Sequence, residues 1–215
     1  MEDHRTVWPV PVMCGMPQVS PSGYYAWRAR PEAKRAAENR VLLDEIRTAH
    51  AAANQVWLAD LTYIATGEGW LYLAAIMDLH TRKIVGWSMR DHLKAELAMS
   101  ALLMATQRQR PGGGLVHHSD RGIQYACGDY QAALDQASIT PSMSRRANPL
   151  HNAPMESFLH TLKTELVHHR TYATRDEAKR DLFAYVEGFY NRQRLHSALD
   201  YHMPNQAERQ AERVA

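Results

Sequence analysis

Three acidic residues in separate parts of the chain have the chemistry to bind a divalent cation. Asp60 lies inside a strand-like run, Asp120 follows a short apolar run, and Glu156 lies in a helix-like segment. Mg²⁺ prefers carboxylate oxygens and keeps much of its water. Two such ions, about 3.5–4 Å apart, can hold the attacking and the leaving oxygen of a phosphoryl transfer. If the fold gathers the three carboxylates, the sequence predicts an enzyme that acts on phosphodiesters.

Each acid taken alone is weak evidence for a metal site. An aspartate at a strand end is usually a cap or turn residue, and a lone glutamate on a helix usually faces solvent. Asp78 and Asp91 also lie at the ends of strand-like runs, where these ordinary roles are expected. The metal-site hypothesis therefore depends on all three acids meeting.

The elements that would position the acids begin with three strand-like runs, over residues 56–65, 70–79 and 83–89. Turn signals separate them, so hairpins joining an antiparallel meander are expected. The pattern then alternates. It predicts helices over 93–109, 130–137, 153–169 and 174–199, and strands over 115–119 and 139–144. Such an order is typical of a mixed α/β sheet with helices on its faces.

The start of the chain has a different pattern. Residues 1–30 are rich in Pro and Gly, which argues against a long regular element, and residues 31–50 read as an amphipathic helix that could dock or dimerise. We expect residues 1–50 to form a truncated accessory region and residues 52–210 to form the main domain.

Composition sets broader limits. The 215-residue chain is 45% hydrophobic, enough for a packed core, and its net charge of +2 is too small to indicate nucleic-acid binding by itself. Cys14 and Cys127 lie far apart, so neither a disulfide framework nor structural zinc is indicated. The most apolar run, residues 70–77, is far shorter than the ~20 residues that span a bilayer. With no secretory signal visible, a soluble cytoplasmic protein without a membrane partner is expected.

Several groups of residues, in a fixed order, carry a family resemblance. They are Asn54, Gln55, Val56, Trp57, Asp60, Thr62 and Tyr63; Asp78, Leu79, Arg82, Ile84, Val85, Gly86 and Trp87; His118, Ser119, Asp120, Arg121, Gly122, Gln124 and Tyr125; Asn152, Met155, Glu156, Ser157, Phe158, Leu162, Lys163 and Glu165; and Phe189, Tyr190, Asn191, Arg192, Arg194, His196, Ser197 and Leu199. This pattern resembles the integrase-type catalytic core of bacterial insertion-sequence transposases. The similar proteins are second-reading-frame products related to retroviral integrases.

The resemblance implies a ribonuclease-H-like fold and an acidic triad of Asp60, Asp120 and Glu156 that binds Mg²⁺ or Mn²⁺. The implied activity is DNA strand transfer, in which two ions activate a water or a terminal 3′-hydroxyl for in-line attack on a DNA phosphate. The implied partners are DNA at element ends and at the target, further copies of the chain on that DNA, and a first-reading-frame protein.

Basic residues near the motifs are candidate DNA contacts. The resemblance implies that Lys163 contacts terminal DNA, and the remaining candidates are Arg121, Arg145, Arg146, Arg192, Arg194 and His118. Neutralising phosphates dominates affinity for DNA, yet a solvated charged face would look the same in the sequence. His118 could serve a ligand carboxylate or substrate, or only the core. Thr62 and Tyr63 could orient substrate beside Asp60.

Two departures from the family pattern leave other functions open. A helical DNA-binding segment normally precedes the core, whereas here His50 runs almost directly into Asn54, and residues 147–151 differ from the usual loop before the glutamate. One alternative is therefore a catalytically silent, truncated remnant that binds DNA or oligomerises. Another is a general nuclease with ribonuclease-H-like chemistry.

Overall fold

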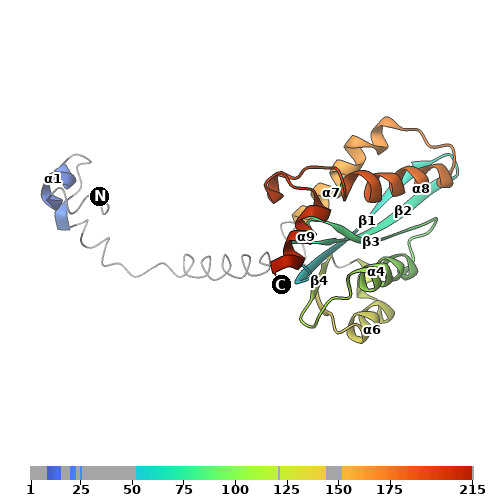
Figure 1. Ribbon diagram of the computed structural model, residues 1–215, viewed down its shortest axis with the longest axis horizontal. Helices are drawn as coiled ribbons and strands as arrows, with labels where there is room; N and C mark the ends of the chain where they lie inside the picture. Colours follow the sequence, from blue (N-terminus) through green and yellow to red (C-terminus); the bar gives the residue numbers. More distant parts are fainter. Residues whose placement is uncertain are drawn as a thin grey trace. The chain divides into compact units, whose positions relative to one another are not determined.

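Figure 1 shows the computed structural model of the chain. The structure describes residues 9–15, 20–22, 25, 52–120, 122–143 and 152–214. The chain divides into two compact units, Met1–Glu45 and Ile46–Ala215. The described part of the first unit contains helix α1 (Val10–Gly15), in which Val10 and Cys14 are buried. The predicted helix over 31–50 lies outside the described residues, and the predicted domain assignment stays a prediction.

A five-stranded sheet forms the centre of the second unit, in the order β3-β2-β1-β4-β5. The strands are β1 (Val56–Thr66), β2 (Gly69–Asp78), β3 (Ile84–Arg90), β4 (Val116–Ser119) and β5 (Thr140–Met143). β2 pairs antiparallel with β1 and β3, while β4 runs parallel to β1 and β5 parallel to β4. The predicted mixed sheet, antiparallel over its first three strands and then parallel, is confirmed.

Helices cover both faces of this sheet (Figure 1). They are α4 (Ala95–Gln109), α5 (Ile123–Ala126), α6 (Gly128–Gln136), α7 (Ala153–Glu165), η3 (Val167–His169), α8 (Arg175–Phe183), η4 (Ala184–Tyr190), η5 (Ser197–Leu199) and α9 (Pro204–Val214). None of the helices in the described ranges has both the length and the hydrophobicity needed to span a bilayer.

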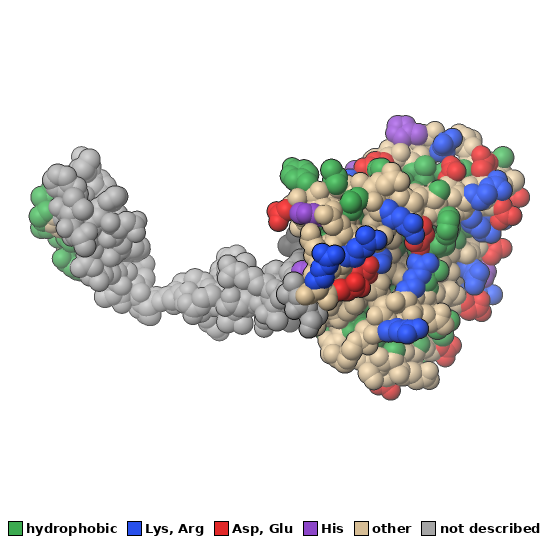
Figure 2. All heavy atoms as spheres, in the orientation of Figure 1, with side chains coloured by type: hydrophobic (Ala, Val, Ile, Leu, Met, Phe, Trp, Pro, Cys, Tyr) green, Lys and Arg blue, Asp and Glu red, His purple; other side chains and the backbone are tan. Residues whose placement is uncertain are grey.

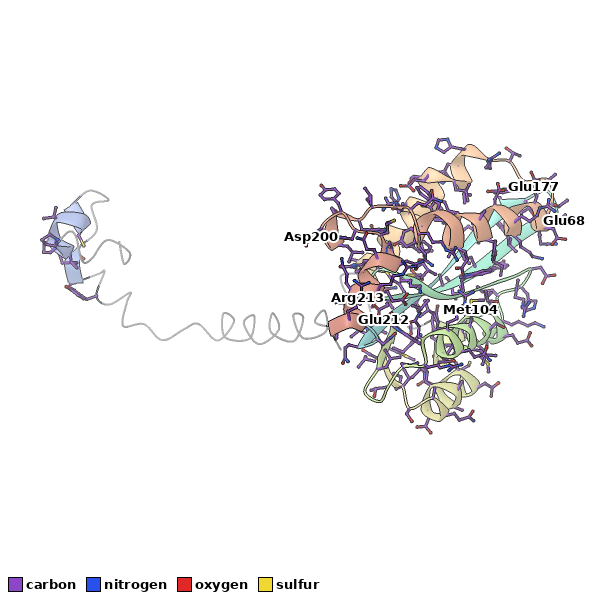
Figure 3. The ribbon with its side chains drawn as sticks, viewed as in Figure 1. Glu68, Met104, Glu177, Asp200, Glu212 and Arg213 are labelled. Carbon is purple, nitrogen blue, oxygen red and sulfur yellow. The ribbon has the colours of Figure 1, made fainter. Side chains whose placement is uncertain are left out.

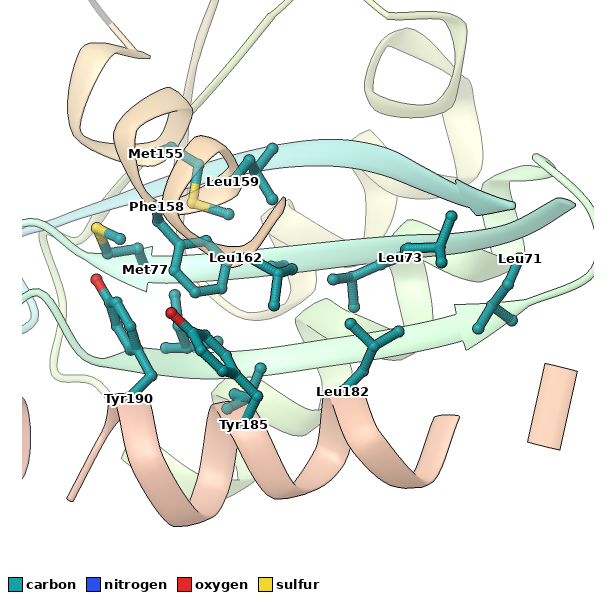
Figure 4. Close-up of a cluster of buried hydrophobic side chains, with 14 of the residues drawn as sticks. Leu71, Leu73, Met77, Met155, Phe158, Leu159, Leu162, Leu182, Tyr185 and Tyr190 are labelled. Carbon is teal, nitrogen blue, oxygen red and sulfur yellow. The ribbon is translucent and has the colours of Figure 1, made fainter. Parts of the chain in front are cut away.

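Neighbouring residues of β1 point to opposite faces and so belong to different cores. Leu58 belongs to the core under α7 and α8, whereas Trp57 belongs to the core under α4 and α6. This alternation is the period-2 pattern of a strand covered on both sides. Figure 4 shows the first core, where α7, α8 and η4 pack against β2. Its members include Leu71, Leu73, Met77, Met155, Phe158, Leu162, Leu182, Tyr185 and Tyr190.

The C-terminal region differs from the sequence prediction. The predicted helix over 174–199 is α8 followed by the π-helical turn η4, which ends at Tyr190, and the prediction did not include α9. Asn191 explains this end: its side chain accepts from the Ile84 backbone N–H (2.9 Å) and donates to the Ile84 carbonyl (3.0 Å). These bonds tie the chain to the start of β3, and helical periodicity cannot reveal such a contact.

Candidate active site

Asp60 and Asp120 come together because of the pairing between β1 and β4. These parallel strands pair from Val56↔Val116 to Ala59↔Ser119, and each aspartate is the next residue after the last pair. β4 ends at Ser119, whereas β1 continues to Thr66 with Asp60 paired to Ala75 of β2. The two acids, 60 residues apart in the sequence numbering, therefore lie side by side where the pairing of β1 with β4 ends.

Glu156 reaches the same place from the first turn of α7. The residue before α7, Asn152, is buried, and its side-chain amide donates to the carbonyl of Ala59 at 3.3 Å. Since Ala59 directly precedes Asp60, this bond fixes the start of α7 next to the first acid. Asn152 belongs to the family motif, but its positioning role could not be assigned from the sequence, because its partner lies on a distant strand.

The electrostatics of Asp60 show that the three acids are close. Burial raises the pKa of Asp60 to about 6; the Leu61 N–H, which donates to its carboxylate (2.7 Å), opposes the shift, and the charges of Asp120 and Glu156 raise the pKa further. A nearby negative charge disfavours ionisation of a carboxyl group, so Asp120 and Glu156 both act on Asp60. This excess negative charge is the electrostatic environment that a cation would neutralise.

The carboxylate oxygens of the three acids are suitable ligands for a hard divalent cation. The three side chains do not, however, converge on one point. Within the described ranges, no three His, Cys, Asp or Glu side chains are arranged to hold a metal ion. Asp120 is exposed and accepts a bond from the backbone N–H of Gly122 (2.9 Å), and Glu156 is also exposed. Shared coordination therefore requires these two exposed side chains to rotate toward the half-buried Asp60.

Lys163 adds a cation to this group. It follows Glu156 by two turns of α7, and its charge lowers the pKa of Asp60. Its ammonium lies 5.0 Å from the centre of the Tyr63 ring. The Glu156 carboxylate and the Lys163 ammonium of α7 therefore both act on Asp60 of β1.

The other predicted DNA contacts have varied surroundings. Arg121, Arg145, Arg146 and the altered loop over 147–151 lie outside the described residues. His118 is buried, and its Nδ1 hydrogen bonds to the Ser142 hydroxyl (2.9 Å). Arg192 is exposed, whereas Arg194 forms a salt bridge with Glu165 (2.9 Å). Contact of any of these residues with DNA stays a prediction.

Asp78 has the ordinary structural role that its position suggested. Its buried carboxylate accepts bonds from the Thr81 N–H and hydroxyl (2.8 Å each) and from the Asn54 N–H (2.7 Å). These donors hold the turn between β2 and β3. Asp78 is therefore a turn residue.

Comparisons with known proteins place these features in a family. Integrase core domain families match residues 50–149 and 137–204. The 31 kDa protein of insertion element IS600 from Shigella sonnei is 53% identical over 151 residues, 70% of this chain and 56% of that protein. The transposase for IS904 from Lactococcus lactis is 47% identical over 158 residues, 74% of this chain and 62% of that protein. The transposase InsF of IS3A from Escherichia coli K12 is 43% identical over 155 residues, which are 72% of this chain and 54% of that protein. The chain thus spans little more than half the length of these relatives.

Solved structures share the fold at low sequence identity. The catalytic core of BIV integrase matches with a TM-score of 0.54 and 16% identity, over 75% of this chain and 97% of that one. The HTLV-2 integrase catalytic core, in a structure with magnesium, matches with a TM-score of 0.54 and 15% identity, over 74% and 99%. A chain in a simian T-cell lymphotropic virus intasome gives a TM-score of 0.61 at 18% identity, over 73% and 55%. These matches confirm the ribonuclease-H-like fold.

Proposed function

Because this chain belongs to the integrase core family of insertion-sequence transposases, we propose that it cleaves DNA and transfers strands, with Asp60, Asp120 and Glu156 as its metal-binding catalytic acids. The observation that supports the proposal is geometric: Asp60 and Asp120 each directly follow the last β1–β4 pair, and Glu156 lies in the first turn of α7, whose start Asn152 ties to Ala59. Structural aspartates such as Asp78 are surrounded by donors, whereas Asp60 has two carboxylates as neighbours.

The chemistry is an in-line displacement at a DNA phosphate. A water or a 3′-hydroxyl oxygen forms the new bond to phosphorus as the bond to the leaving 3′-oxygen breaks. When bound, Mg²⁺ or Mn²⁺ in two positions would activate the attacking oxygen and stabilise the leaving oxygen. Asp60 would be the fixed ligand, because it is half-buried in a strand, and the exposed Asp120 and Glu156 would close on the substrate. Lys163 would hold a phosphate beside them.

The wider assembly is part of the same proposal. Its substrates would be the ends of the element and a target DNA, and its partners would be further copies of the chain on DNA and a first-reading-frame protein. A strand transferase must hold two DNA segments together, and this requirement favours more than one copy of the chain.

The test is cleavage and joining of duplexes that carry the element's own ends, with the full chain in Mg²⁺ and in Mn²⁺. We expect Asp120→Asn and Glu156→Gln each to reduce turnover at least about a hundredfold, because metal-assisted charge stabilisation contributes several kcal/mol. Asp135→Asn is the matched control, since Asp135 is an exposed acid at the end of α6, and it should keep full activity.

Three results would contradict the proposal. Activity that persists in Asp120→Asn would remove the acid from the mechanism. Salt-sensitive DNA binding without turnover in either metal would instead indicate a silent DNA-binding protein. Cleavage of RNA in a hybrid, with no requirement for element ends, would indicate a general nuclease.

A further inference from the structure

Two aromatic rings are exposed on the β1–β2 hairpin, which also carries Asp60. The Tyr63 side chain of β1 is 55% exposed and the Trp70 side chain of β2 is 49% exposed. Their rings meet edge to face, with centroids 4.9 Å apart. Burial of large aromatic surface is favourable, so a pair that leaves half its surface in water has apolar area available for a ligand.

The hairpin that carries these rings is held rigidly at its tip. The Gly67 N–H donates to the carbonyl of Tyr172 (2.9 Å), and the Arg175 guanidinium donates to the carbonyl of Trp70 (3.1 Å). The Arg175 backbone N–H also donates to Glu68, which Figure 3 labels at this end of the unit. Bonds with Tyr172 and with Arg175, the first residue of α8, thus fix the backbone that carries Trp70. A binding surface on a rigid element loses little entropy when its ligand docks.

The pair also has a cation and a defined distance from the acids. Lys163 places its ammonium 5.0 Å from the centre of the Tyr63 ring. Tyr63 follows Asp60 by three residues, which span about 10 Å along a strand, and this odd offset starts the two side chains on opposite faces of β1. Lys163 links them, because its charge acts on Asp60 while its ammonium lies over the Tyr63 ring. The span of about 10 Å equals about three base steps of DNA at 3.4 Å each. Beyond Ala59, β1 has no pairing with β4, so this part of the strand is not covered by the parallel half of the sheet.

We propose that Tyr63 and Trp70 form a stacking platform for an unpaired base, a few nucleotides from the phosphate that reacts at the three acids. The Lys163 ammonium lies over one face of the Tyr63 ring, and the pair leaves other aromatic surface exposed. A base stacked on that exposed surface, with its neighbouring phosphate paired to the ammonium, would match the two parts of a nucleotide. The platform would hold the end of a DNA strand unpaired and in register with the catalytic acids. This inference rests on the proposed function.

The experiment measures base stacking directly and does not require turnover. The full chain is titrated, with Ca²⁺ in place of Mg²⁺, against element-end DNA that carries 2-aminopurine as an unpaired base at successive positions from the strand end. Stacking on an aromatic ring changes the emission of this base. We expect the change at positions about three steps from the reacting phosphate and not deep within the duplex.

Variants separate stacking from the electrostatic contact. Tyr63→Ala and Trp70→Ala should each abolish the emission change and weaken binding roughly tenfold. Tyr63→Phe should retain both properties, because the ring remains. Lys163→Ala should weaken binding, but the emission change should persist at saturation. Tyr201→Ala removes another aromatic side chain, 70% exposed and outside the hairpin, and should match the unmodified chain. Urea unfolding of each variant checks that the fold is retained.

The outcomes distinguish this inference from the strand-transfer proposal. An emission change that survives in both Tyr63→Ala and Trp70→Ala would overturn the platform, even if strand transfer is normal. A chain that shows the change and loses it in both variants, yet never cuts DNA, would support the platform and overturn strand transfer. No binding to any DNA would overturn both.

Discussion

Asp60 and Asp78 lie on paired strands, yet their surroundings give them opposite roles. Asp78 receives hydrogen bonds from Thr81 and from Asn54, so its charge is compensated within the fold. Among the described residues, Asp60 receives one hydrogen bond, from the Leu61 N–H, and the charges of Asp120 and Glu156 act on it. An aspartate three residues before a threonine is a recognisable turn pattern, so the role of Asp78 was open to prediction from its neighbours in sequence. The like-charged neighbours of Asp60 are distant in sequence, so the residue types offered their meeting as a hypothesis and the family resemblance implied it.

A buried histidine beside the site makes stability depend on pH. His117 is 1% exposed, and its Nε2 hydrogen bonds to the Tyr130 hydroxyl at 3.0 Å. Burial lowers its pKa to about 4, and the neighbouring His118 adds to the shift. The unfolded chain therefore binds this proton more readily than the folded chain does. The stabilisation is complete above about pH 6.5 and is lost as the pH falls toward 4.

We predict that His117 accounts for about 2 kcal/mol of the loss in unfolding free energy between pH 7 and pH 5. His117→Gln removes the titration and keeps a hydrogen-bonding side chain, so its unfolding free energy should fall less over this interval. Urea unfolding of both chains at the two pH values measures the difference. An equal fall in both would show that other groups cause the acid sensitivity.

At the scale of elements, local sequence patterns could be predicted, whereas contacts between distant elements could not. The alternation in β1 and the apolar stripe of α7 are local, and both elements were predictable from the sequence. The register of β1 with β4 is long-range, as is the bond from Asn152 to Ala59. No period in the sequence encodes either contact. The sequence therefore predicted where the acids lie on their elements, while the fold determined how the elements meet.

The contact between β3 and α4 depends on a glycine. A Cβ added at Gly86 would lie 2.3 Å from the carbonyl oxygen of Ala101 and 2.7 Å from the Cβ of Ala105. Both neighbours belong to α4, and the first is backbone, which cannot turn away. The close approach of this helix to the sheet therefore requires the absence of a side chain at Gly86.

We predict that Gly86→Ala lowers the unfolding free energy by at least about 1–3 kcal/mol, because overpacking must push α4 away from β3. Gly113→Ala is the matched control: nothing lies within 4 Å of a Cβ at Gly113, so its effect should stay within about 0.5 kcal/mol. Chemical denaturation of both variants gives the comparison. Equal stabilities would mean that α4 can shift without cost.

At the scale of the whole molecule, the net charge of +2 is a poor guide to DNA binding, because a sum does not show where the charges lie. Figure 2 shows Lys and Arg side chains interspersed with Asp and Glu on the visible face of the second unit. Some cations of this unit are paired with carboxylates, among them Lys83 with Glu208 at 2.6 Å and Arg194 with Glu165. A paired cation contributes less to phosphate binding, because it must first leave its carboxylate. DNA affinity should therefore depend on the unpaired cations.

Arg192 and Arg194 provide the test, since they lie two residues apart. Arg192 is exposed, and no ion pair joins it to another described residue. If each neutralised phosphate changes the slope of log K against log [salt] by about 0.9, Arg192→Ala should make that slope shallower by about this amount. Arg194→Ala should leave the slope nearly unchanged and instead lower the unfolding free energy, because Glu165 loses its salt bridge and keeps the hydrogen bond from the Tyr185 hydroxyl. Binding of element-end DNA between about 50 and 200 mM salt, with urea unfolding in parallel, measures both effects.

Equal changes of slope in the two variants would contradict this prediction. They would show that the Arg194 salt bridge opens to bind DNA, and that pairing in the free protein does not determine which cations contact phosphate.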